Sequence, residues 1–201
     1  MKKQLATTFS LLITLFSGSL FATEQGAATP YKSIELQSSR HIEERIEVAF
    51  YYAYGDQASF ELNRQLENWL QTIPETAYFI RRPSINTEKD WALALSYTRA
   101  EMLGKGDKVH AALFKALNQT PPTLNSMEEL VRFNADQEIN GNLPTHILQA
   151  NFKRLSSEWM GNSFLTTPSV VVDQKYLLTK EMAGSNEALI SLINELIKKR
   201  E

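Results

Sequence analysis

The stretch of residues 46–70 constrains the fold of this chain more than any other. Residues 46–54 are β-branched and aromatic with a single charge, which is typical of a strand covered on both faces. The turn that follows, residues 55–59, offers helix-start amide groups that favour an anion. Beyond the turn, apolar residues recur at helical spacing, at Leu62, Leu66, Trp69 and Leu70. We therefore expect any functional chemistry of this fold at the strand-to-helix turn.

Segments on either side of this stretch predict further strands. Residues 78–80 form a short apolar run after the helix, and a strand, a helix and a strand at this spacing make a βαβ unit with parallel strands. Residues 31–36 predict a short edge strand, and the polar residues 38–44 predict a connection.

The second half of the chain changes from helices back to strands. Residues 87–160 show only helical periodicity, and Ser126 followed by Glu129 predicts a capping box within them. Residues 169–178 predict a hairpin, and Ser185 predicts the start of a final helix. The order is thus two strands, a helix and a strand, then a helical block, then two strands and a helix.

The strand, turn and helix at residues 46–70 resemble the active-site segment of DsbA-like proteins, the periplasmic thiol oxidoreductases of the thioredoxin superfamily. In that family an aromatic strand, often ending in Tyr-Gly, leads into Cys-Pro-His-Cys. Matching Tyr54 and Gly55 to the family's Tyr-Gly places Asp56 on the nucleophilic cysteine and Ser59 on the resolving cysteine. The middle pair is then Gln57 and Ala58. A register one or two residues earlier also fits, but no register supplies a thiol.

The resemblance extends over nearly the whole chain after residue 22. Gly104 to Val109, Thr167-Pro168 and Lys175-Tyr176 each match a short motif of the family in the right order. The resemblance implies an α/β fold, thioredoxin-like with an inserted all-helical domain. It places the thioredoxin-like domain at residues 23–86 and 161–201 and the helical domain at residues 87–160.

Composition excludes several kinds of function. The chain has no cysteine, so it cannot form a disulfide or pass one on, because exchange requires a thiolate that attacks sulfur. Acidic residues outnumber basic ones by 23 to 21, and no long basic run occurs, so nucleic acid is not an expected partner.

The N-terminus predicts export. Lys2 and Lys3 precede an uncharged apolar run that ends near Ala22, which is typical of a secretory signal peptide at residues 1–22. A retained membrane anchor is the alternative, but the Ser, Thr and Gly content of the run argues against it. We expect a periplasmic protein that is free of the membrane after cleavage.

Asp56 and Ser59 are the first candidate site residues. We expect Asp56 to be the helix N-cap, with Ser59 in the first turn, because Asp is strongly preferred at caps. The functional alternative is that this acidic tip contacts a client or a small ligand. Nucleophilic catalysis by Ser59 is not expected, because a serine needs an adjacent base and the sequence identifies none.

Thr167 and Pro168 are the second candidate. The resemblance implies a cis-proline that lies across from the turn, with the residue before it able to pair with the main chain of a bound peptide, a mode that needs no thiol. The alternative is that Pro168 only shapes the entry to a strand. With Tyr54 as the most exposed of the nearby tyrosines, the candidate peptide-binding residues are Tyr54, Gly55, Asp56, Thr167 and Pro168.

The remaining polar and aromatic candidates favour structural roles. The three histidines, at positions 41, 110 and 146, are dispersed without metal-ligand spacing, so neither a metal nor a cofactor is expected. Trp91 and Trp159 lie on amphipathic faces typical of core. Arg81-Arg82 is expected to be a solvated strand end, with anion binding as the alternative.

Three functional hypotheses follow. The first is a redox-inactive DsbA-like protein that binds an exported polypeptide or partner protein around Asp56 and Pro168. The second is a glutathione-transferase-like enzyme on the same fold, against which the charge of Asp56 argues because it would repel a thiolate. The third is a structural or regulatory partner that uses its helical face. Ancestry alone would also give the chain a family-level label of thiol:disulfide oxidoreductase.

Overall fold

The computed structural model describes residues 29–36 and 44–199. The predicted signal peptide, His41 and most of the predicted connection at residues 38–44 lie outside these residues.

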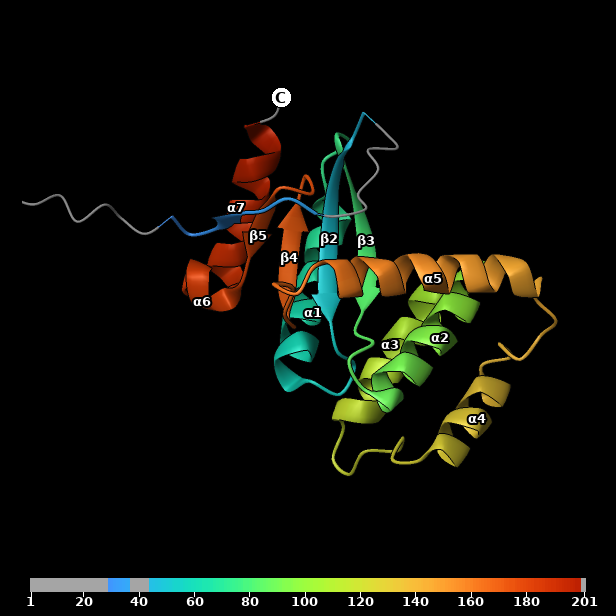
Figure 1. The fold of residues 1–201 in the computed structure, drawn as a ribbon. Coiled ribbons are helices and arrows are strands. Elements are labelled where there is room, and N and C mark those ends of the chain that lie inside the picture. Colours follow the sequence, from blue (N-terminus) through green and yellow to red (C-terminus); the bar gives the residue numbers. More distant parts are fainter. Residues whose placement is uncertain (1–28, 37–43, 200–201) are drawn as a thin grey trace, which may run out of the picture.

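A five-stranded mixed sheet forms the centre of the molecule (Figure 1). Its spatial order is β1-β5-β4-β2-β3; β2 and β3 pair in parallel, and the other neighbours are antiparallel. The predicted strand at residues 31–36 is much shorter in the structure. The strands are β1 (Lys32–Ser33), β2 (Ile46–Tyr52), β3 (Ala77–Pro83), β4 (Ser169–Val172) and β5 (Tyr176–Leu178).

Helix α1 (Gln57–Trp69) joins β2 to β3, which confirms the predicted βαβ unit. The helix continues as a 3-10 turn, η1 (Leu70–Thr72), and the chain leaves it before Pro74. Leu62 and Leu66 of α1 pack with Phe50 and Val48 of β2 in the larger core cluster. Every residue of β2 is buried, as expected for a central strand with both faces covered.

Four helices lie between β3 and β4: α2 (Glu88–Met102), α3 (Gly106–Asn118), α4 (Met127–Asp136) and α5 (Thr145–Gly161). Thr87 caps α2, and Ser126 and Glu129 form the predicted capping box of α4. Helix α5 lies across the sheet on the face opposite α1 (Figure 1). It contributes a second core cluster, in which Phe152, Leu155 and Trp159 meet Ala49 and Tyr51 of β2.

The chain ends in two helices, α6 (Lys180–Ala183) and α7 (Asn186–Lys198). Ser185 caps α7 as predicted, and α7 packs on the α1 side of the sheet through Leu189 and Ile193. The single turn α6, capped by Thr179, was not predicted. The architecture confirms the predicted α/β class: a thioredoxin-like fold with helices inserted between its two halves.

Candidate functional site at the strand-to-helix turn

Asp56 is the N-cap of α1, as predicted. Its backbone is extended, and its side chain accepts hydrogen bonds from the N–H groups of Ala58 (3.3 Å) and Ser59 (2.9 Å). These N–H groups lie in the first turn of the helix, where no backbone carbonyl is available to them, and the helix dipole also favours a negative charge there. The carboxylate therefore occupies the anion-binding end of α1.

Ser59 is fully buried, with 0% of its surface exposed. Its Oγ accepts from the N–H of Ala53 (3.2 Å) and donates to Oδ2 of Asp56 (2.6 Å). The hydroxyl thus ties the end of β2 to the cap of the helix, and it is not accessible to a substrate. Its immediate neighbours in the turn, Gly55, Gln57 and Ala58, are exposed.

Thr167 and Pro168 lie at the same end of the sheet as the turn. Ser169, the first residue of β4, pairs with Tyr51 near the end of β2, just before the chain turns into α1 (Figure 1). The Thr167–Pro168 peptide bond is cis, and both residues are half-buried. Within the described part of the chain, the Thr167 peptide group has no hydrogen-bond partner. A second chain could therefore pair with it.

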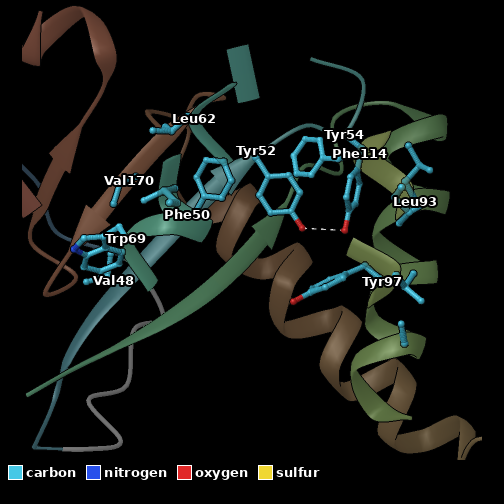
Figure 2. Packing of buried hydrophobic residues seen from close by; sticks show 14 of the residues in the cluster. Val48, Phe50, Tyr52, Tyr54, Leu62, Trp69, Leu93, Tyr97, Phe114 and Val170 are labelled. Atoms are coloured by element: carbon cyan, nitrogen blue, oxygen red, sulfur yellow. Dashed lines mark hydrogen bonds between the residues drawn. The ribbon is translucent and has the colours of Figure 1, made fainter. Parts of the chain in front are cut away.

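The prediction that Tyr54 is exposed is wrong, because only 2% of its surface is accessible. The end of β2 runs beneath the inserted helices, and the ring of Tyr54 packs edge-on against Phe114 of α3, with 4.9 Å between ring centroids. Figure 2 shows Tyr54 beside Phe114, with its hydroxyl joined to that of Tyr52. Tyr54 therefore supports the turn from below and offers no contact surface.

A buried polar network underlies the turn. Nε2 of His110 lies 2.8 Å from Oδ1 of Asn63, which only accepts, so Nε2 carries the proton and Nδ1 is an acceptor. The hydroxyl of Tyr52 donates to that of Tyr54 (3.1 Å), which in turn lies 3.1 Å from Nδ1 of His110. Burial, and then the charge of Arg81, hold the pKa of His110 well below its ordinary 6.5, so the imidazole is neutral.

Asn118 connects the inserted helices to the turn itself. Its amide nitrogen donates to the carbonyl oxygen of Tyr54 (2.7 Å) and to that of Phe114 (2.9 Å). Neither Asn118 nor His110 was predicted as a site residue. Their partners, Tyr54 in the turn after β2 and Asn63 on α1, lie 47 to 64 residues away in the sequence, so no local spacing could indicate them.

Arg81 and Arg82 belong to β3 itself, and the prediction of a solvated strand end is wrong. Arg81 pairs with Glu67 (2.8 Å) and Asp107 (2.7 Å), and Arg82 pairs with Glu158 (3.0 Å) on the other face of the sheet. Glu158 also accepts the hydroxyl hydrogen of Tyr51. The paired carboxylates outweigh burial and raise the pKa of both guanidinium groups.

The two predicted core tryptophans differ in burial. Trp159 is buried, and its Nε1 donates to the carbonyl of Pro83 (2.9 Å). Trp91 is 46% exposed, so the expectation is wrong for this residue; it covers Phe152 at 4.8 Å between ring centroids. In the described residues, no three His, Asp or Glu side chains are placed to hold a metal ion. None of the described helices is long and apolar enough to cross a membrane.

The fold and this turn define a thioredoxin-fold protein with a helical insertion and a capping aspartate at the start of α1. No protein-family model matches the sequence. The sequence is 24% identical to the thiol:disulfide interchange protein DsbA of Pseudomonas syringae pv. tomato over 199 residues, which cover 92% of each chain. It is also 24% identical to DsbA of Pseudomonas aeruginosa over 211 residues, covering 99% of this chain and 97% of the other.

Solved structures agree with the sequence relatives. The crystal structure of Pseudomonas aeruginosa DsbA superposes with a TM-score of 0.73 at 21% identity and covers 89% of this chain and 96% of its own. The oxidoreductase DsbA from Xylella fastidiosa superposes with a TM-score of 0.70 at 19% identity, covering 85% and 94%. The chain thus has a DsbA-like thioredoxin fold, and its sequence contains no cysteine.

Proposed function

We propose that this chain is a redox-inactive DsbA-like protein that binds an exported polypeptide or partner protein. The binding surface is the turn and the loop before β4, with Gly55, Asp56, Thr167 and Pro168 as its contact residues. The observation that carries the proposal is the position of Asp56. A carboxylate occupies the helix end where a related oxidoreductase would need a thiolate.

The chemistry of Asp56 and Ser59 supports the loss of redox activity. Thiol–disulfide exchange moves two electrons between sulfur atoms, and neither an oxygen acid nor a hydroxyl can hold them. The carboxylate of Asp56 already accepts hydrogen bonds from the backbone N–H groups of Ala58 and Ser59 and from the Ser59 hydroxyl. Asp56 and Ser59 therefore satisfy each other's hydrogen-bonding groups within the turn. The burial of Ser59 also counts against a glutathione-transferase-like role, which would need this hydroxyl to face a bound thiolate.

The surroundings of Pro168 support recognition of an extended peptide. The Thr167 peptide group is unpaired within the described residues and lies at the edge where exposed Gly55, Gln57 and Ala58 also gather. Main-chain pairing there would add a strand-like segment to the protein without any thiol. Tyr54 is buried beneath this surface and supports it through its hydrogen bonds with Asn118 and His110.

We place this function in the periplasm. The proposal rests on the signal-peptide pattern of residues 1–22 and on the sequence similarity to DsbA proteins. Fractionation of cells that produce the full chain, with N-terminal sequencing of the product, tests both export and cleavage near Ala22. A product that keeps residues 1–22 in the membrane fraction would contradict this placement.

Two measurements test the proposal. A photo-crosslinking amino acid at position 167 should capture an unfolded, cysteine-free polypeptide in proportion to its concentration. The same group at the exposed Val131 of α4 is the matched control and should capture far less. Equal capture at the two positions would contradict the binding site, and insulin reduction above background by the purified chain would contradict redox inactivity.

A further inference from the structure

A polar cavity lies on the opposite side of β3 from β2, where the strand meets the inserted helices. Its volume is about 150 Å³, and it is lined by residues of β3, α2 and α5. None of the proposed contact residues at the turn lines it. Whatever it binds is therefore independent of the function proposed above.

One guanidinium group in the cavity lining has no ion pair among the described residues. Arg81 is paired with Glu67 and Asp107 and Arg82 with Glu158, which leaves the guanidinium of Arg154 without a carboxylate partner. Glu101, the other carboxylate of the lining, is exposed to solvent. Glu158 is already engaged, because both of its oxygens lie 3.0 Å from Nε of Arg82. The unpaired guanidinium of Arg154 is therefore the positive charge that a singly negative ligand would meet in the cavity.

Arg81 lines this cavity and has an unused donor. Its Nη1 and Nη2 bind Asp107 and Glu67, but its Nε has no hydrogen-bond partner in the described structure. The Arg81 side chain is only 10% exposed, so this N–H is not simply solvated at the surface. A buried donor of this kind is stabilised by an acceptor that enters the cavity.

Helix α5 supplies two further donors. Asn151 and Arg154 lie one helical turn apart and both line the cavity. Neither side chain makes a hydrogen bond or ion pair to the rest of the described chain. Arg81, Asn151 and Arg154 thus line one cavity, and each has an N–H group without a protein partner that can donate to a carboxylate.

Part of the lining is apolar. Leu155 and Pro83 complete the cavity wall beside these donors. An oxyanion with no apolar part would leave this wall uncovered, whereas a short aliphatic chain would bury it.

We propose that this cavity binds a short aliphatic carboxylate. The carboxylate head accepts from Arg81 Nε, the Arg154 guanidinium and the Asn151 amide, and the aliphatic part contacts Leu155 and Pro83. A single unpaired guanidinium group matches one carboxylate better than it matches a doubly charged oxyanion such as sulfate.

Titration of the ¹⁵N-labelled chain with butyrate, at ionic strength held constant with chloride, tests the site. The backbone amides of Thr98, Asn151 and Leu155 should shift along one saturable curve, and sulfate should bind more weakly. Arg154→Gln should raise the dissociation constant about tenfold or more, because a charge-assisted pair is lost. Lys153→Gln removes the same charge one residue away, at an exposed position outside the cavity, and should leave the constant unchanged.

Three results would overturn the proposal: butyrate shifts that do not saturate, equal weakening by Arg154→Gln and Lys153→Gln, or tighter binding of sulfate than of butyrate. Arg154 is exposed, so Arg154→Gln should fold normally, and its amide spectrum and thermal midpoint verify this. Should that variant fail to fold, Asn151→Ala removes one neutral donor from the same helix face and should weaken butyrate binding severalfold.

Discussion

The hydroxyl of Ser59 donates a 2.6 Å hydrogen bond to Oδ2 of Asp56, three residues earlier at the cap of α1. The same Oδ2 accepts the Ser59 backbone N–H, and Ser59 Oγ accepts from Ala53. The two residues that the resemblance places at the positions of the family cysteines are therefore joined by a hydrogen bond. This link holds the turn in shape without sulfur.

Asp56→Ala should lower the free energy of unfolding by about 1 kcal/mol, because two first-turn N–H groups lose their acceptor. Asp56→Asn keeps a capping oxygen and should lower it by less. Denaturant unfolding of the three proteins measures both differences. Equal losses for the two variants would show that the charge of Asp56, rather than its cap geometry, stabilises the turn.

The combined change of Asp56→Cys and Ser59→Cys should give the chain thiol–disulfide exchange activity. The scaffold already presents the first position at the end of α1, where the amide groups and the dipole lower a thiol pKa. Insulin reduction and the thiol titration curve measure the outcome. Asp56→Cys alone is the control, and it should form mixed disulfides that it cannot resolve.

Acid should destabilise the protein through His110. Its folded pKa lies well below 6.5, and the unfolded pKa lies near that value, so the unfolded chain binds a proton first as the pH falls. The stabilisation is complete above about pH 6.5 and decreases below it, by at most about 1.4 kcal/mol per pH unit for this one proton. His110→Gln should remove this component of the slope in unfolding experiments across the range.

The burial of the Arg82–Glu158 pair should make it far more sensitive to mutation than an exposed pair. Glu158→Ala leaves Arg82 and the Tyr51 hydroxyl without their acceptor and should destabilise the fold by about 3 kcal/mol or more. Glu128→Ala breaks the exposed pair with Arg132 on α4 and should change stability by about 0.5 kcal/mol or less. Comparable losses in denaturant unfolding would contradict the contrast.

Local features of the fold could be predicted from the sequence, and contacts between distant segments could not. The caps at Asp56, Ser126 and Ser185 depend on residues within one helical turn, so short spacing revealed them. The hairpin and the parallel βαβ unit follow from alternation and connection length in the same way.

Tyr54 and the arginines of β3 show why the rest could not be predicted. A tyrosine beside a turn is exposed unless another part of the chain covers it, and here α3 does so from more than 50 residues away. The strand end at Arg81 and Arg82 is likewise covered by carboxylates from α1, α3 and α5. Sequence periodicity states which side chains share a face, but not which distant helix covers that face.

Consecutive residues of a strand point to opposite faces, so Arg81 reaches α3 on one side of the sheet while Arg82 reaches α5 on the other. The two ion pairs hold α3 and α5 against β3 from opposite faces of the sheet. Hinge motion of the insertion would have to break at least one of these pairs. If a polypeptide docks beside Pro168 as proposed, helices held in this way would lose little conformational entropy when it binds.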